Sequence, residues 1–206
     1  MELTQKKTWI QLLLIVLLFF LGSHMISFLS NEVFYTWSDA TQDFVFYPLK
    51  LILLIVGGVL ITKRKPFEFQ KVTLKMFVGC ILLLFLTWVV ANGINITIDK
   101  FYPVFINFSK SKSSSEFKWM VPVFMAPLLE ELFFRGILFR QLEKVFKGPA
   151  IAIVLGGVFF GLVHSSLPQM IFNAILGIAY CYVYWKTRNI GVTIFGHFLQ
   201  NVFFHF

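Results

Sequence analysis

The chain has 206 residues, of which 58% are hydrophobic and 14% are charged, and its mean hydropathy is +0.79. These values lie far outside those of soluble domains and exclude an ordinary cytosolic protein. The net charge of +8 would suit a nucleic-acid-binding protein, but the basic residues lie in short stretches between long apolar runs, as membrane topology determinants do. We therefore expect the lipid bilayer, and no nucleic acid, as a partner.

Seven apolar segments follow one another along the chain, each close to the roughly 20 residues that a membrane-spanning helix needs. Continuous apolar runs without alternation favour helices over a transmembrane barrel. The predicted spans, in chain order, are 9–29, 45–62, 74–96, 119–140, 149–166, 168–185 and 190–206. The predicted fold is therefore all-α: a polytopic membrane helix bundle with about seven transmembrane helices, forming a single domain over residues 1–206.

The distribution of basic residues predicts the orientation of the bundle. Twelve lysines and arginines precede the first span or lie in the second, fourth and sixth connections, whereas the opposite side has four lysines and several acidic residues. Cytoplasmic loops carry an excess of Lys and Arg. We therefore expect the N-terminus to be cytoplasmic.

The predicted span 119–140 carries two adjacent glutamates, Glu130 and Glu131, and an arginine one helical turn later, Arg135. A charge at the centre of the bilayer costs at least roughly 2.5 kcal/mol, so such residues usually pair, face a cavity or perform chemistry. Glu131 and Arg135 share a helix face and are expected to form an ion pair. Glu130 is turned by about 100° and is expected to face a cavity as a general base for water. The alternative is that both glutamates serve helix–helix contacts.

Two further spans carry histidines. His164 follows Phe160 by four residues, so both rings lie on one helical face. His197 and Asn201 are also four residues apart and share a face, where they would activate water or stabilise an oxyanion. For His164 the alternative is an interfacial residue or a satisfied polar group of the core, and for His197 and Asn201 it is a polar contact between helices. Lys50, within the second span, is expected to extend toward an interface.

The predicted span limits place these residues at different depths in the membrane. Glu130 falls near the middle, His197 in the inner half and His164 near the outer end. A common site requires these depths to converge. We therefore expect a kink at Pro168 or a displaced span limit.

Three motifs resemble, in order, those of the CAAX-protease and bacteriocin-processing family (CPBP, Abi-type) of intramembrane endopeptidases. They are EExxxR at 130–135, FxxxH at 160–164 and HxxxN at 197–201. Each motif alone is weak, but three in the family's order within residues 119–201 form a strong pattern. The first three spans match the family only in being hydrophobic.

The resemblance implies a hydrolytic site in a cavity of the bundle. Carried over to this chain, the catalytic residues would be Glu130, His164, His197 and Asn201. The first two would activate a water that attacks the scissile carbonyl, and the last two would stabilise the tetrahedral oxyanion. Glu131 and Arg135 would be structural support for the catalytic helix.

The cofactor stays open at this point. The family is often described as metalloproteases, but it also resembles glutamate-dependent proteases that work without metal. Glu130, His164 and His197 would be the three ligands of a zinc ion with an open position, and no HExxH helix is present to decide. We favour a water activated directly by Glu130.

The predicted function is peptide-bond hydrolysis by a multi-pass membrane endopeptidase whose substrate is a membrane-associated peptide or protein. Small bacterial members of the family are linked to bacteriocin maturation or self-immunity, so the resemblance implies a bacterial cell membrane. The alternative is a non-enzymatic membrane immunity or binding protein. A proton-coupled transporter is a third class, but the sequence shows no repeated halves of the kind that such proteins commonly have.

Overall fold

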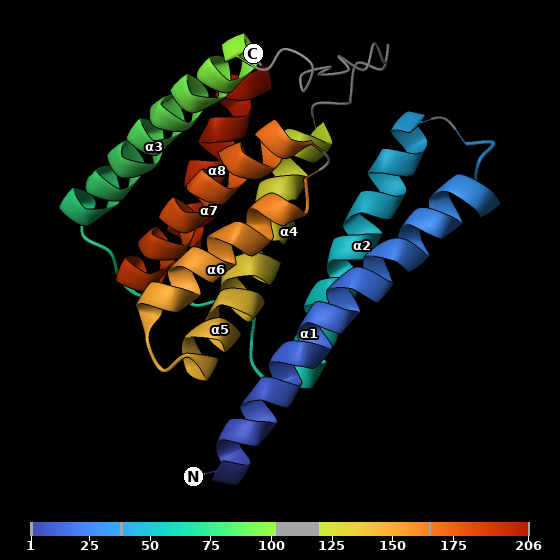
Figure 1. Ribbon diagram of the computed structural model, residues 1–206, viewed down its shortest axis with the longest axis horizontal. Coiled ribbons are helices and arrows are strands. Elements are labelled where there is room, and N and C mark those ends of the chain that lie inside the picture. Colours follow the sequence, from blue (N-terminus) through green and yellow to red (C-terminus); the bar gives the residue numbers. More distant parts are fainter. Residues whose placement is uncertain (1, 38, 102–119, 165, 206) are drawn as a thin grey trace.

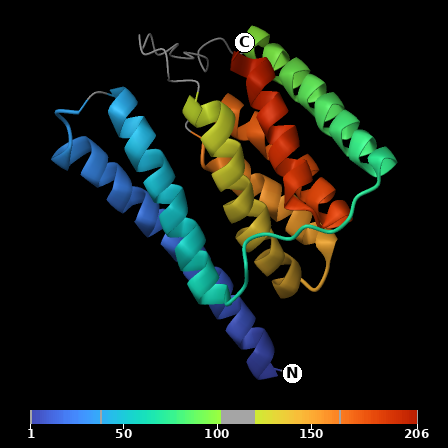
Figure 2. The same cartoon turned by 180° about the vertical axis from the view of Figure 1, so that it is seen from behind.

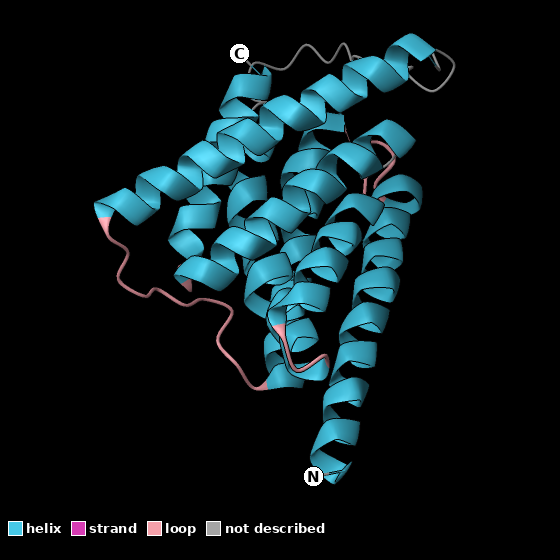
Figure 3. Cartoon of the chain, turned by 60° about the vertical axis from the view of Figure 1, so that its left-hand side comes forward, coloured by secondary structure: helices cyan, strands magenta, loops and turns pink. Residues whose placement is uncertain are grey.

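The computed structural model describes residues 2–37, 39–101, 120–164 and 166–205. Over these residues the chain is helical apart from short connections, and its one strand-like pairing is an isolated bridge between Phe69 and Asn189. Figure 3 shows this helical architecture. The prediction of an all-α membrane bundle is confirmed. The helices are α1 (Glu2–Phe28), α2 (Asp39–Thr62), α3 (Leu74–Phe101), α4 (Ala126–Phe133), α5 (Arg140–Val145), α6 (Pro149–Leu162), α7 (Leu167–Thr187) and α8 (Ile190–His205) (Figure 1).

Helices appear at each of the seven predicted segments, but they differ in their capacity to cross a membrane. Among the described residues four stretches are long and apolar enough: Leu3–Val33, Phe44–Thr62, Leu74–Ile98 and Leu167–Thr187. α6 and α8 are apolar but shorter. The number of seven crossings thus stays a prediction, whereas the order of the helices is as expected.

The fourth predicted span is one continuous helix that includes two π-wound stretches. Val121–Met125 precedes α4, and Phe134–Phe139 joins α4 to α5. Such turns widen the helix locally and are frequent at functional sites. The helix continues to Val145, beyond its predicted end at residue 140. The region around the two glutamates is therefore irregular on both sides.

Close helix packing surrounds this central helix. α6 and α7 pack through glycines: a Cβ atom on Gly177 would lie 2.9 Å from the Cα of Gly157, and one on Gly161 would lie 2.3 Å from the Met170 carbonyl oxygen. Membrane helices associate through such close backbone approach because lipid offers no hydrophobic driving force. In Figures 1 and 2 the α1–α2 hairpin lies on one flank of the α4–α8 group and α3 on the other.

The turn between α5 and α6 resolves the predicted conflict of depths. Glu130 lies 15 residues before Val145, and His164 lies 15 residues after Pro149. The two residues are therefore equally far from the turn. The 14 residues of α6 extend about 21 Å, short of the roughly 30 Å hydrocarbon core, so His164 stays inside the bundle. The span limit at 166 was wrong, and Pro168 lies in the first turn of α7 instead of kinking a long helix.

The connection 63–73 runs from α2 to α3 along one end of the bundle (Figure 2). The backbone N–H of Gln70 donates to the Arg188 carbonyl at 3.1 Å, which fastens the connection to the α7–α8 turn. Gly136 makes room for it, because a Cβ atom there would lie 1.8 Å from the Pro66 carbonyl oxygen. Glycine is thus required at this position for the connection to reach the central helix.

Gly136→Ala is expected to displace this connection and to destabilise the protein by about 1–3 kcal/mol, the usual cost of overpacking. Gly79→Ala is the matched control, because no described atom lies within 4 Å of the added Cβ and alanine favours a helix by up to about 1 kcal/mol. Thermal unfolding in detergent measures both. Equal unfolding temperatures for the two variants would contradict the prediction.

Candidate active site

The centre of the site is a buried ion pair. Arg135 Nη1 donates to Glu131 Oε1 at 2.9 Å, and neither side chain has solvent-exposed surface. Glu131 belongs to α4 and Arg135 to the π-wound stretch that follows it. The ion pair expected from the four-residue spacing is therefore present.

Two aromatic rings and a backbone carbonyl surround the Arg135 guanidinium. Its central carbon lies 4.4 Å from the Phe160 ring centroid and 5.0 Å from that of Tyr180, and Nη2 lies 3.4 Å from the Gly177 carbonyl oxygen. A desolvated cation over an aromatic face gains about 2 kcal/mol. Among the described residues Arg135 Nε and Glu131 Oε2 have no hydrogen-bond partner. The aromatic contacts thus supply part of the compensation for burying this charge.

The same oxygen of Glu131 also contacts the imidazole of His197. His197 Nδ1, on α8, lies 2.9 Å from Glu131 Oε1, a geometry in which Nδ1 carries a proton and donates it. His197 Nε2 lies 4.0 Å from Glu130 Oε2, too far for a hydrogen bond. The His197 side chain, 6% exposed, also packs on the rings of Phe160 and Tyr180. His197 therefore lies between the two glutamates.

Glu130 differs from its neighbour in both exposure and partners. Its side chain keeps 16% of its surface exposed, against 0% for Glu131. Its Oε1 accepts a hydrogen bond from the Tyr47 hydroxyl on α2, while Oε2 faces His197. Of the two carboxylates, Glu130 is the one that a water molecule can reach.

The remaining predicted residues lie at the ends of this cluster. His164, just after α6, has Nδ1 2.9 Å from the Phe160 carbonyl oxygen, which leaves Nε2 as an acceptor. It interacts electrostatically with Glu130 and His197. Asn201 Nδ2 donates to the Pro122 carbonyl at 2.7 Å and keeps a second N–H. The structure therefore gathers the histidines and glutamates, and holds Asn201 against the start of the central helix.

Two residues of α2 reach the site without having been expected there. Tyr47 contacts Glu130, and the Lys50 ammonium group lies 5.9 Å from the Tyr47 ring centroid and interacts with the Glu130 charge. Lys50 thus faces the site, although the sequence predicted that it would extend toward an interface. Two polar side chains three residues apart in an apolar run share a helix face, which is the one local pattern that would have indicated them.

The three predicted zinc ligands do not surround a common position in the described structure, and zinc dependence stays a prediction. Among the described residues no group of three or more His, Cys, Asp or Glu side chains is arranged to hold a metal. Nδ1 of both His164 and His197 is engaged with an oxygen, so Nε2 would be the metal-binding atom of each, and His197 Nε2 lies 4.0 Å from Glu130 Oε2. We therefore derive no catalytic step through a metal.

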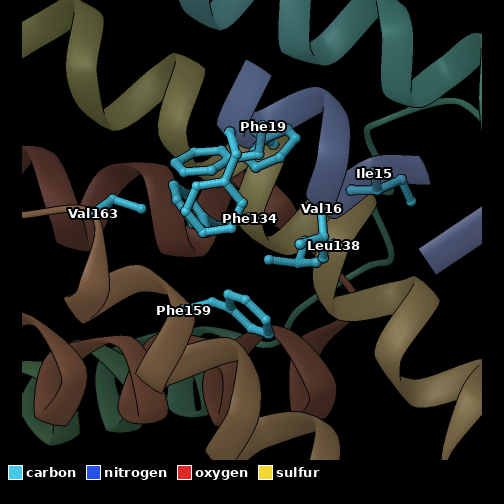
Figure 4. Close-up of a pocket in the computed structure, with 9 residues that line it drawn as sticks. Ile15, Val16, Phe19, Phe134, Leu138, Phe159 and Val163 are labelled. Atoms are coloured by element: carbon cyan, nitrogen blue, oxygen red, sulfur yellow. The ribbon is translucent and has the colours of Figure 1, made fainter. Parts of the chain in front are cut away.

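A small apolar pocket, with room for little more than one water molecule, lies between α1, the central helix and α6 (Figure 4). It is lined by hydrophobic residues alone, namely Ile15, Val16, Phe19, Phe20, Phe133, Phe134, Leu138, Phe159 and Val163. Such a lining offers neither a proton donor nor an acceptor. The pocket therefore holds none of the polar residues that a hydrolytic site would need.

Fold and site together define a multi-pass helical membrane protein with carboxylates and imidazoles inside its bundle. Residues 113–203 match the family model described as Type II CAAX prenyl endopeptidase Rce1-like. The resemblance found in the three motifs is therefore confirmed: this part of the chain is similar to CAAX proteases.

Curated relatives match about two fifths of the chain. It is 34% identical over 88 residues to the putative membrane peptidase YdiL of Bacillus subtilis, covering 41% of this chain and 34% of that protein. It is 30% identical over 94 residues to the membrane-embedded CAAX protease MroQ of Staphylococcus aureus, covering 40% and 38%. The matched stretch thus spans little more than a third of the length of these relatives. No solved structure matches the chain.

Proposed function

We propose that the chain is an intramembrane endopeptidase that hydrolyses peptide bonds of a membrane-associated peptide or protein. The observation that carries this proposal is the convergence of Glu130, His164 and His197 inside an apolar bundle. The family match of residues 113–203 supports it. The relatives described as a membrane peptidase and a CAAX protease support the same class of reaction.

In the proposed first step Glu130 takes a proton from a water molecule whose oxygen attacks the scissile carbonyl carbon. A positioned carboxylate of this kind contributes typically 100- to 10,000-fold to a rate. His164 accepts a hydrogen bond from the same water at Nε2 and orients it. The partial exposure of Glu130 supports its role as the base.

In the proposed second step hydrogen bonds stabilise the tetrahedral oxyanion. His197 donates from Nε2 in its doubly protonated form while Glu131 holds its Nδ1–H, and Asn201 adds its second N–H. Glu130 then passes its proton to the leaving amine nitrogen, and the C–N bond breaks to give a carboxylic acid and an amine. Glu131 and Arg135 support the helix and do not touch the substrate.

We further propose that the protein acts in a bacterial cell membrane with its N-terminus in the cytoplasm. The excess of lysine and arginine at one end of the bundle supports this orientation. A role in bacteriocin maturation or self-immunity is the proposed context, because small family members are linked to it.

The test compares two histidine variants against a quenched peptide library, with the purified full chain in detergent. His164→Ala is expected to lower turnover by at least about 100-fold. His24→Ala, on the exposed face of α1, is the control and should cleave like the wild type. A parallel series with a chelator and with added zinc tests the metal-free reaction.

Cleavage that survives in the His164→Ala variant would contradict the proposal, because a contaminant would then be responsible. Loss of cleavage with chelator, restored by zinc, would overturn the metal-free mechanism. A wild-type protein that cleaves nothing, but still protects cells against a bacteriocin, would favour the non-enzymatic binding function.

A further inference from the structure

α2 contributes to the site although it lies outside the residues that match the family. The Tyr47 hydroxyl donates to Glu130 Oε1 across 83 positions of sequence. Lys50, one turn further along α2, adds a positive charge that interacts with the same carboxylate. Some of the polar contacts of Glu130 therefore come from a helix outside residues 113–203, the part of the chain that matches the family model.

The packing of α2 explains why Tyr47 points at Glu130. Tyr47, Leu51 and Leu54 are spaced four and three residues apart and so share one helix face. Leu51 and Leu54 are buried in the core that also contains residues of the central helix. A phenol on such a face needs a hydrogen-bond partner, and Glu130 is that partner.

We propose that Tyr47 is a positioning residue that holds one oxygen of Glu130 and so directs the other toward His197. The two oxygens of the Glu130 carboxylate have different neighbours. Oε1 accepts a hydrogen bond from Tyr47, and Oε2 lies 4.0 Å from His197 Nε2. A carboxylate fixed at one oxygen presents the other in a single direction, which proton transfer from an oriented water requires. The catalytic consequence rests on the proposed peptidase function.

The chain contains a matched pair that has the same chemistry away from the site. Tyr184 donates from its hydroxyl to Glu68 Oε2 at 3.1 Å, where the connection 63–73 meets α7. Removing the hydroxyl from Tyr184 deletes an equivalent hydrogen bond without touching Glu130. A comparison of Tyr47→Phe with Tyr184→Phe therefore separates the loss of a hydrogen bond's stability from the loss of Glu130 positioning.

The first experiment requires no substrate. The full chain in detergent is treated with dicyclohexylcarbodiimide, a hydrophobic reagent that converts a carboxyl group to an N-acylurea, and mass spectrometry measures the labelling rate at Glu130. Tyr47→Phe is expected to raise this rate about tenfold, the factor that corresponds to loss of one charge-assisted hydrogen bond. Tyr184→Phe is expected to leave it unchanged. Equal rates in the wild type and Tyr47→Phe, or an equal rise in both variants, would overturn the proposal.

The second experiment uses a quenched peptide that the wild type cleaves. Tyr47→Phe is expected to lower kcat about tenfold with KM unchanged, and to lower the unfolding temperature no more than Tyr184→Phe does. Tyr184→Phe is expected to keep the wild-type kcat, whereas a purely structural effect would lower kcat equally in both variants. An unchanged kcat would overturn the catalytic role of Tyr47. If the wild type cleaves no peptide but the labelling contrast persists, the peptidase function fails while the positioning of Glu130 by α2 stands.

Discussion

Replacement of Glu130 by glutamine is expected to lower peptide turnover about 10,000-fold, at the upper end for loss of a general base, while the bundle stays folded. The amide has the size of the carboxylate and keeps an oxygen for the Tyr47 hydroxyl, but it cannot take a proton from water. The rate at which the variant cleaves a peptide substrate measures the loss of turnover. The unfolding temperature in detergent shows whether the bundle stays folded.

Glu68→Gln is the matched control for this substitution. Glu68 also accepts a hydrogen bond from a tyrosine, Tyr184, but it lies in the connection 63–73 and touches no residue of the proposed mechanism. The control should keep its turnover. If Glu130→Gln retains more than about a tenth of wild-type turnover, Glu130 is not the base.

Arg135→Met is expected to destabilise the protein by about 3–5 kcal/mol, because it leaves the Glu131 carboxylate buried without its counterion. Arg135 and Glu131 have no exposed surface, so water cannot replace the lost partner. The free energy of unfolding in detergent measures the effect. Turnover should fall as well, since Glu131 also holds His197.

A double variant tests the physical reason for that loss. Glu131→Gln combined with Arg135→Met leaves no buried charge, and the new amide still offers an oxygen to His197 Nδ1. We expect the double variant to regain most of the lost stability, since a buried ion pair is often replaceable as a unit. A double variant no more stable than Arg135→Met would show that the aromatic contacts of Arg135, and not its charge, stabilise the site.

The helices were predictable because continuous apolar runs are a strong pattern in sequence. The position at which the central helix ends was not predictable in this way. The charges of Arg140 and Lys144 predicted a loop, but both residues lie in α5, so the helix continues through them. That error moved Glu130 toward the middle of its predicted span, and together with the span limit at 166 it separated Glu130 from His164. Counting from the turn at 146–148 would have placed both at one depth.

The candidate site was predictable where contacts are local. The four-residue spacing of Glu131 and Arg135 implied their ion pair. Tyr47 was missed because its contact with Glu130 depends on how α2 packs, which no spacing within one helix encodes. The contact of Asn201 with the Pro122 carbonyl was missed for the same reason, because it joins α8 to a π-wound stretch. The catalytic roles of the six site residues stay predictions that the variants test.

The sharing of a single Glu131 oxygen by a guanidinium and an imidazole has an evolutionary consequence. Under the proposed mechanism, this atom affects both the stability of the fold and the rate of turnover. Phe160 and Tyr180 contact both Arg135 and His197, so we expect substitutions of these two rings to be tolerated mainly in combination. Divergence among descendants of this chain should therefore accumulate first on α1 and α3, which leave that atom undisturbed.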